Sequence, residues 1–133
     1  MQMNPQEFQP PAAYLTKSFE NKTTINRISV GVGVHIIKPG RYELTSRLED
    51  ERGEELGKDS VTNSLLPGNS TILVDFNPTK FMMLGRKSQL YLKDIILSVN
   101  GTELDRLDEA WSSNAMSPAA FKRATKVSGN VTI

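Results

Sequence analysis

The segment from Ile28 to Ile36 alternates between apolar residues and small or polar residues without interruption. The apolar residues share one parity: Ile28, Val30, Val32, Val34 and Ile36. The other parity is occupied by Ser29, Gly31, Gly33 and His35. A period of two residues is typical of a β-strand that buries one face. Because the same alternation recurs downstream, this segment limits the chain to a fold built mainly from strands.

The recurring alternation predicts further strands, separated by turns rich in proline, glycine and asparagine. We expect strands at residues 14–18, 28–37, 41–48, 54–62, 71–76, 89–99 and 102–107, with a further strand at 126–133. Residues 41–48 and 54–62 are predicted to form a hairpin around an acidic turn. Asn100-Gly101 is a strong hairpin-turn dipeptide and predicts a second hairpin.

Three segments lack the alternation of a half-buried strand. Residues 89–99 carry large apolar side chains on both parities, which is typical of a central strand covered on both sides. Residues 81–84 are predicted to be a short apolar connection. Ser117-Pro118, followed by two alanines, predicts an N-capped helical turn.

These elements predict an all-β protein, an immunoglobulin-like antiparallel β-sandwich of about seven strands with one short helical turn near the C-terminus. The chain has 133 residues, a length expected of one domain. Three prolines lie within residues 1–13, which we expect to be a linker or boundary segment. Residues 14–133 are expected to form the single β-sandwich domain.

The composition argues against several kinds of partner and site. Sixteen Lys and Arg against 15 Asp and Glu leave a net charge of +1, so the chain has no general attraction to nucleic acid or to an anionic membrane. It contains no cysteine, which excludes disulfides and cysteine-based metal sites or nucleophiles. No apolar run approaches the roughly 18 residues of a membrane span. We therefore expect no nucleic-acid partner and no membrane insertion.

The open parity of the 28–36 strand is a candidate docking surface, formed by Ser29, Gly31, Gly33 and His35. Its residues offer little bulk, so a partner domain or a ligand can approach closely. Gly31-Val32-Gly33 lies inside a strand, and the favoured explanation of these glycines is the close approach of another element, or a β-bulge. His35 is the only histidine, and a lone histidine is more often a polar residue on an open face than a catalytic or metal-binding group.

Trp111 is a second candidate for ligand contact. It precedes Ser112, Ser113 and Asn114 in a stretch interpreted as a loop, where its ring can stack on a sugar with polar groups at the rim. The alternative is a packing anchor, which is the commoner role of a single tryptophan in a loop.

Two acidic clusters are candidate calcium sites. The first is the turn with Glu49, Asp50, Glu51, Glu54 and Glu55, and the second is Asp105, Asp108 and Glu109. Carboxylates on a loop can hold Ca²⁺, but neither cluster has the order of residues found in an EF-hand. A solvated hairpin tip is the favoured interpretation of the first cluster, and no metal or other cofactor is predicted.

Tyr42 has a structural interpretation. It follows Gly40 by two residues and leads an alternating strand. This position predicts a buried tyrosine whose hydroxyl group bonds to backbone across a corner of the sandwich.

The stretch from Lys38 to Phe121 resembles a β-sandwich module of large bacterial and archaeal exported proteins. The resemblance rests on three pieces of sequence: Pro39-Gly40-Arg41-Tyr42-Glu43-Leu44 with Leu48 and Gly53; Leu66-Pro67-Gly68-Asn69 with Ile72, Val74 and Phe76; and Leu90-Tyr91-Leu92-Lys93-Asp94-Ile95-Ile96-Leu97 with Asn100-Gly101, Leu104-Asp105, Asp108, Ala110-Trp111 and Phe121. The chain departs from the pattern at Ser88-Gln89-Leu90-Tyr91, where such modules favour glycine-proline-tyrosine. The resemblance implies an extracytoplasmic location (secreted, cell-surface or periplasmic) and a place beside other domains, and it carries no functional residues.

These observations predict a non-enzymatic structural or interaction module of an exported bacterial protein, which spaces or docks neighbouring domains. No motif for a nucleophile with its base, or for a metal hydrolase, occurs in the sequence. The expected partners are neighbouring domains of the same polypeptide or another surface protein. The alternative is a carbohydrate- or surface-ligand-binding module, with Trp111 or the glycine face as its platform.

Overall fold

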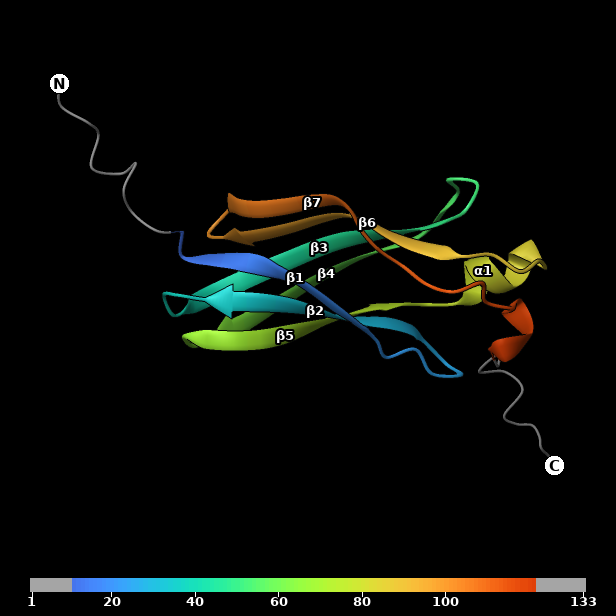
Figure 1. Ribbon diagram of the computed structural model, residues 1–133, viewed down its shortest axis with the longest axis horizontal. Helices are drawn as coiled ribbons and strands as arrows, with labels where there is room; N and C mark the ends of the chain where they lie inside the picture. The colour runs from blue at the N-terminus through green and yellow to red at the C-terminus, as the bar shows by residue number, and fades with distance from the viewer. Residues whose placement is uncertain (1–10, 122–133) are drawn as a thin grey trace, which may run out of the picture.

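The protein is an elongated sandwich of two antiparallel sheets that lie face to face (Figure 1). The computed structural model describes residues 11–121. The elements in chain order are β1 Ala13–Asn21, β2 Ile28–Ile36, β3 Gly40–Asp50, β4 Glu55–Leu65, β5 Gly68–Phe76, α1 Thr79–Leu84, β6 Leu90–Val99, β7 Thr102–Ser112 and a 3-10 turn at Pro118–Ala120. The predicted fold class is therefore confirmed, and the predicted strand at 126–133 lies outside the described residues.

The two sheets divide the strands unequally. One sheet has the order β1-β2-β5 and the other has the order β4-β3-β6-β7. Both predicted hairpins are present, since β4 pairs with β3 and β7 pairs with β6. Val99 pairs with Thr102 across Asn100-Gly101, and both turn residues have positive φ values of 50° and 78°, as a tight two-residue hairpin turn requires.

Strand β6 lies at the centre of its sheet, as predicted, but it is not covered on both sides. Thr45 of β3 pairs with Ile96 and Arg47 pairs with Lys93, so two residues of β6 lie opposite Ser46. This is a β-bulge, and it contains Asp94 with a φ of 51°. The bulge changes the parity of the strand, so that one inner face receives four fully buried residues: Leu90, Leu92, Ile95 and Leu97. The apolar residues on both parities therefore result from the bulge, with Ile96 half-buried on the outer face.

The core between the sheets is closed at one corner by Tyr42. Its side chain is 1% exposed, and its hydroxyl group donates to the backbone carbonyl oxygens of Lys38 at 2.6 Å and Ala12 at 3.1 Å. The predicted corner tyrosine is thus present. It ties β3 to the turn before it and to the residue that precedes β1.

Both open edges of the sandwich are bridged by aspartates that point inward. Asp105 of β7 accepts the N–H of Leu15 in β1 at 2.9 Å. Asp59 of β4 accepts the N–H of Asp75 in β5 at 2.8 Å. In each case the edge strand of the four-stranded sheet satisfies a backbone donor on the edge strand of the other sheet. Inward-pointing charged residues also protect sheet edges against pairing with other chains.

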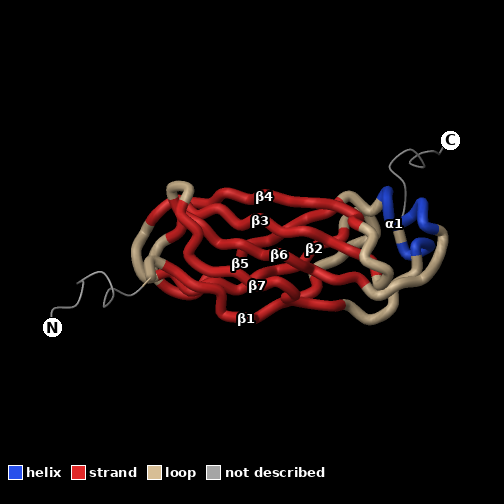
Figure 2. The backbone as a smooth tube through the Cα atoms, turned by 90° about the horizontal axis from the view of Figure 1, so that it is seen from above, coloured by secondary structure: helices blue, strands red, loops and turns tan. Residues whose placement is uncertain are grey.

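The segment predicted as a short apolar connection is a six-residue helix, α1, at one end of the sandwich (Figure 2). Phe81 is fully buried and meets Phe121 edge-on, with ring centroids 5.8 Å apart. Gly85 ends the helix in the left-handed conformation, with a φ of 68°. Within residues 11–121, no helix has the length and apolar character needed to cross a membrane.

Removing the ring of Tyr42 should destabilise the protein strongly. We expect Tyr42→Ala to lower the free energy of unfolding by about 3–5 kcal/mol, as loss of a buried aromatic side chain does. Tyr42→Phe should cost about 1 kcal/mol, because it removes only the hydrogen bonds of the hydroxyl group. Urea unfolding of the three proteins measures both differences, and equal stability of all three would show that the ring is not part of the core.

Alkaline pH should remove the contribution of the hydroxyl group. Burial raises the pKa of Tyr42 above the ordinary value of about 10, so the folded state favours the neutral phenol. The stability that this provides is complete below pH 10 and is lost as the pH rises through the folded-state pKa. In urea unfolding, the free-energy difference between the wild type and Tyr42→Phe should therefore shrink above pH 10. A constant difference up to pH 12 would contradict the assignment.

Candidate functional site

The predicted docking surface lies on the outer face of the three-stranded sheet. Gly33 and His35 are half-buried, whereas Ser29 and Gly31 are buried beneath side chains of the neighbouring strands. Ser29 donates a hydrogen bond to the carboxylate of Asp75 in β5. The structure thus brings the four predicted residues together on one strand face, but it covers half of them.

Gly33 is required by the adjacent strand. The register between β1 and β2 shifts between Leu15 and Phe19, so that three residues of β1 lie opposite Gly33. Lys17, at the centre of this bulge, has a φ of 66°. A Cβ atom on Gly33 would lie 3.0 Å from the Cβ and 3.2 Å from the carbonyl oxygen of Ser18. The favoured explanation of the glycines, close approach of another element or a bulge, therefore holds at this position.

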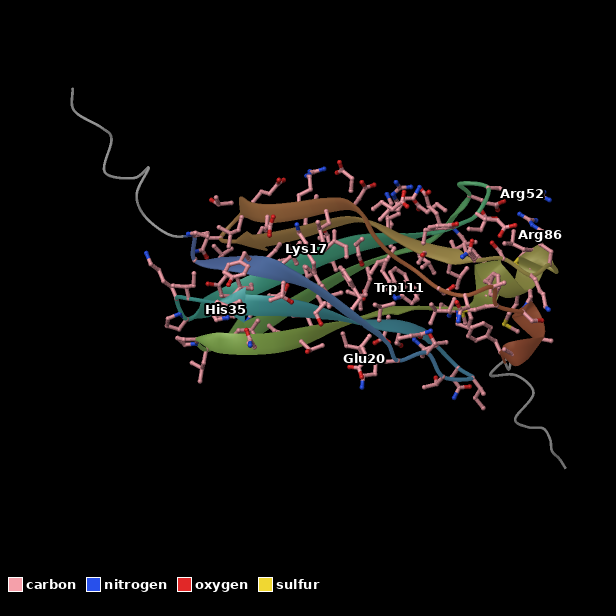
Figure 3. The ribbon with its side chains drawn as sticks, in the orientation of Figure 1. Lys17, Glu20, His35, Arg52, Arg86 and Trp111 are labelled. Atoms are coloured by element: carbon pink, nitrogen blue, oxygen red, sulfur yellow. The ribbon has the colours of Figure 1, made fainter. Side chains whose placement is uncertain are left out.

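At one end of this face, β1 and β5 supply two residues that the sequence interpretation missed. Tyr14, 42% exposed, lies against His35 with ring centroids 5.2 Å apart. The Nδ1 atom of His35 is 2.7 Å from the Oδ1 atom of Asn69. Figure 3 shows His35 near this end of the sheet, away from Glu20. The pairing of β1 and β5 with β2 creates this group, and no local sequence signal connects positions 14, 35 and 69.

Trp111 lies in strand β7, which extends five residues beyond its predicted end, so the loop interpretation of this stretch was wrong. Trp111 pairs with the buried Leu92 and is partly buried against the core. Figure 3 places it between the two sheets. This position is that of a packing residue at the β1–β7 edge.

The first acidic cluster is not simply a solvated hairpin tip, because two of its members are buried. The carboxylate of Asp50 is fully buried, accepts the N–H groups of Arg52 and Glu54, and pairs with Arg86 at 2.8 Å. The carboxylate of Glu49 pairs with two cations of the sheet. Only the remaining acidic residues of the turn face solvent around the tip.

The carboxylate of Asp50 is therefore a structural part of the turn. The run of charged residues in the sequence did not indicate that this carboxylate is buried. Its oxygen atoms already receive three donors, which leaves little capacity for a cation. Glu49 likewise forms ion pairs with Arg47 and with Lys93, the latter at 3.2 Å.

The second acidic cluster lies on β7 and is dispersed along it. Asp105 points inward to β1, Asp108 lies 3.8 Å from Arg106, and Glu109 lies 4.0 Å from Lys93. Among residues 11–121, no group of three or more metal-ligating side chains lies close enough to hold an ion.

The outer face of the four-stranded sheet carries a hollow that the sequence interpretation also missed. Its volume is about 500 Å³, and its walls come from β3, β4 and β6: Thr45, Ser46, Arg47, Lys58, Asp59, Ser60, Asp94 and Ile96. Two rows of paired residues cross it. Thr45 pairs with Ser60 and Ile96, and Arg47 pairs with Lys58 beside the bulge residue Asp94.

The hollow exists because short side chains alternate with long ones across the strands. Thr45 and Ser60 lie beside the longer Arg47 and Lys58, and Ile96 forms an apolar side. Arg47 holds Asp94 through its Nε atom at 2.9 Å and an Nη atom at 2.6 Å. The only sequence signal for the site was the change of apolar parity along residues 89–99, which marks the bulge.

No known protein family matches the sequence, and no curated protein has a detectably similar sequence. Solved structures do share the fold. A DUF4785 family protein from Legionella pneumophila is 20% identical with a TM-score of 0.53, and the match covers 82% of this chain and 29% of that protein. A β-D-mannosidase from Dictyoglomus thermophilum is 14% identical with a TM-score of 0.52, over 74% of this chain and 13% of that enzyme. This chain is thus similar to β-sandwich parts of larger bacterial proteins.

Alanine substitutions of Gly31 and Gly33 should lower the free energy of unfolding by different amounts. Gly33→Ala meets the backbone of the β1 bulge and should lower the free energy of unfolding by about 1–3 kcal/mol. Gly31→Ala meets mainly the methyl group of Thr71, 2.9 Å from the added Cβ, which can turn aside, so its cost should be smaller. Chemical unfolding measures both values, and an equal or reversed order would show that the bulge does not require Gly33.

Calcium should not stabilise the protein. The carboxylate of Asp50 is buried and already bound by donors of the protein. Because a bound ion would stabilise the folded state, thermal melts in about 5 mM calcium and in excess chelator should coincide. An increase of several degrees with calcium would reveal a cation site that these contacts do not account for.

Proposed function

We propose that this chain is a non-enzymatic structural module that spaces and docks neighbouring domains of an exported bacterial protein. The observation that carries the proposal is the path of the chain through the sandwich. Strand β1 begins at one end of the long axis, and the 3-10 turn at Pro118–Ala120 lies at the opposite end (Figure 1). A module with this path holds preceding and following segments about one domain length apart.

The size of the matched structures supports a modular role. The same sandwich accounts for 29% of the Legionella protein and 13% of the Dictyoglomus enzyme. In both cases it is a minor part of a longer polypeptide. An extracytoplasmic location of the present chain follows from the resemblance described above and belongs to this proposal.

Both ends of the sandwich carry exposed apolar side chains suited to contact with neighbours. At the end that holds α1, Met83 is 75% exposed, and Ile25 in the β1–β2 turn is 50% exposed. At the opposite end, Leu66 in the β4–β5 turn is 75% exposed. Interfaces between domains of one chain typically bury about 600–1,500 Å², which an end surface of this kind can provide.

The outer face of β2 is a second docking surface under this proposal. With Ser29 and Gly31 covered, a neighbour would meet His35 together with the exposed Tyr14 and Leu73. These side chains present a flat, mixed apolar and polar surface. A partner can lie close to it, because Gly33 adds no side chain beyond the bulge of β1.

The absence of an enzymatic role is supported by how the polar groups of the described residues are used. His35, the only histidine of the chain, is paired with the amide of Asn69 and not with a hydroxyl nucleophile or a carboxylate. The buried carboxylates of Glu49 and Asp50 are engaged by cations and backbone donors. They form structural contacts of the sheet and its turn.

Limited proteolysis of the longer native polypeptide tests the docking role. We expect Met83→Glu to speed cleavage at the junction after residue 121 several-fold, because a charged group would disrupt an apolar contact at that end. The matched control is Ser64→Glu, an exposed substitution on β4 opposite Arg41. Both variants of the 133-residue chain should keep the wild-type melting temperature.

An unchanged cleavage rate in Met83→Glu, with the variant shown to be folded, would contradict docking at this end. Equal acceleration by both variants would indicate a general effect of charge and would also contradict it.

A further inference from the structure

The hollow on the outer face of β4, β3 and β6 gathers polar side chains beside the bulge of β6. A bulge with a non-glycine residue at positive φ costs about 1–3 kcal/mol locally. Here the bulge also turns the carboxylate of Asp94 toward Arg47 at the rim of the hollow. Bulges of this kind often redirect a side chain beside a functional site.

The groups around the hollow differ in what they can still bind. Each of the three nitrogen atoms of the Arg47 guanidinium group has a partner, because its Nε atom and one Nη atom bind Asp94 while the other Nη atom pairs with Glu49. Lys58 forms no ion pair with any other residue in 11–121, so its ammonium group has three donors available. Only the Oδ2 atom of Asp94 receives Arg47, which leaves Oδ1 as an acceptor.

The remaining walls add hydroxyl groups and one apolar surface. Thr45 and Ser60 pair across β3 and β4 and place their side chains on the same face. Ser60 donates to Glu43 at 2.8 Å, so its oxygen atom can still accept. Ile96 is apolar and half-buried on a face where most residues are polar.

From this set of groups we infer that the hollow binds a neutral saccharide. Each sugar hydroxyl both donates and accepts, so it matches a site that offers the Lys58 donors beside the Asp94 acceptor and the hydroxyl groups of Thr45 and Ser60. The C–H face of a pyranose ring can lie against Ile96. The volume of about 500 Å³ falls within the roughly 300–1,000 Å³ of small-molecule sites.

Charge favours a neutral ligand over an anion. Two carboxylates lie beside the two cations of the lining, Arg47 and Lys58: Asp94 pairs with Arg47, and Glu43 accepts a hydrogen bond from the lining residue Ser60. Arg47 is already neutralised by Asp94 and Glu49, and a ligand carboxylate near Ser60 would also lie near the carboxylate of Glu43. This inference is independent of the spacing role and extends the protein to ligand binding.

Amide NMR titration of the 133-residue chain tests the inference. The probes are methyl β-D-glucopyranoside, methyl α-D-mannopyranoside and D-glucuronate, each added at increasing millimolar concentration. We expect at least one neutral glycoside to shift the amide signals of Thr45, Ser60 and Ile96 in a saturable manner. In Thr45→Val, which keeps the shape but removes the hydroxyl group, the affinity should fall about tenfold, as loss of one buried hydrogen bond predicts.

The matched control is Thr71→Val, the same exchange at an exposed position on the outer face of the other sheet, and it should bind as the wild type does. A Lys58→Met variant should also weaken binding of the neutral probe. Absence of shifts with both glycosides, shifts located away from the hollow, or equal loss in Thr71→Val would overturn the inference. Binding of D-glucuronate alone, abolished by added salt, would overturn it in favour of an anion site.

Discussion

The structure depends on the bulge in β6 and on the contact between Arg47 and Asp94 that accompanies it. Without the extra residue, the alternation of the strand would carry Ile95 and Leu97 to the outer face. Asp94 and Ile96 would turn inward in exchange, so the core would lose one apolar side chain, which contributes roughly 1.5–3 kcal/mol, and would bury a carboxylate, which costs several kcal/mol more. This exceeds the local cost of a residue at positive φ and is a large fraction of a typical stability of about 5–15 kcal/mol. Core burial therefore determines the bulge, and Arg47 holds the exposed side of it.

The edges of the sandwich are also held by polar contacts between distant strands. An open sandwich leaves four edge strands with unpaired backbone groups. Asp59 and Asp105 each turn inward from the four-stranded sheet and accept one such donor from the opposite sheet. Near the β7 edge, the half-buried Trp111 packs against the core. The same contacts keep the sheets in register and make the edges unsuitable for strand addition, which agrees with a module that meets its neighbours by its ends.

The proposed spacing role and the inferred saccharide site use different parts of the molecule. The ends carry the exposed apolar residues Met83 and Leu66, whereas the hollow lies on the broad outer face of the four-stranded sheet. A neighbour in contact with either end would leave that face free. One small sandwich can therefore hold domains in position and also present a ligand to them.

The sequence by itself determined the strands, the hairpins, the fold class and the corner tyrosine, because these depend on alternation and turn chemistry over a few residues. The period of two along β2 and the Asn100-Gly101 turn required no distant partner. Only the tertiary structure decided which faces were covered and which polar groups met. The burial of Asp50, the group of Tyr14, His35 and Asn69, and the place of Trp111 between the sheets all arise from pairing between distant strands. The hollow beside Asp94 has the same origin, because it requires three strands in register and a bulge whose cost is offset only when the core is assembled.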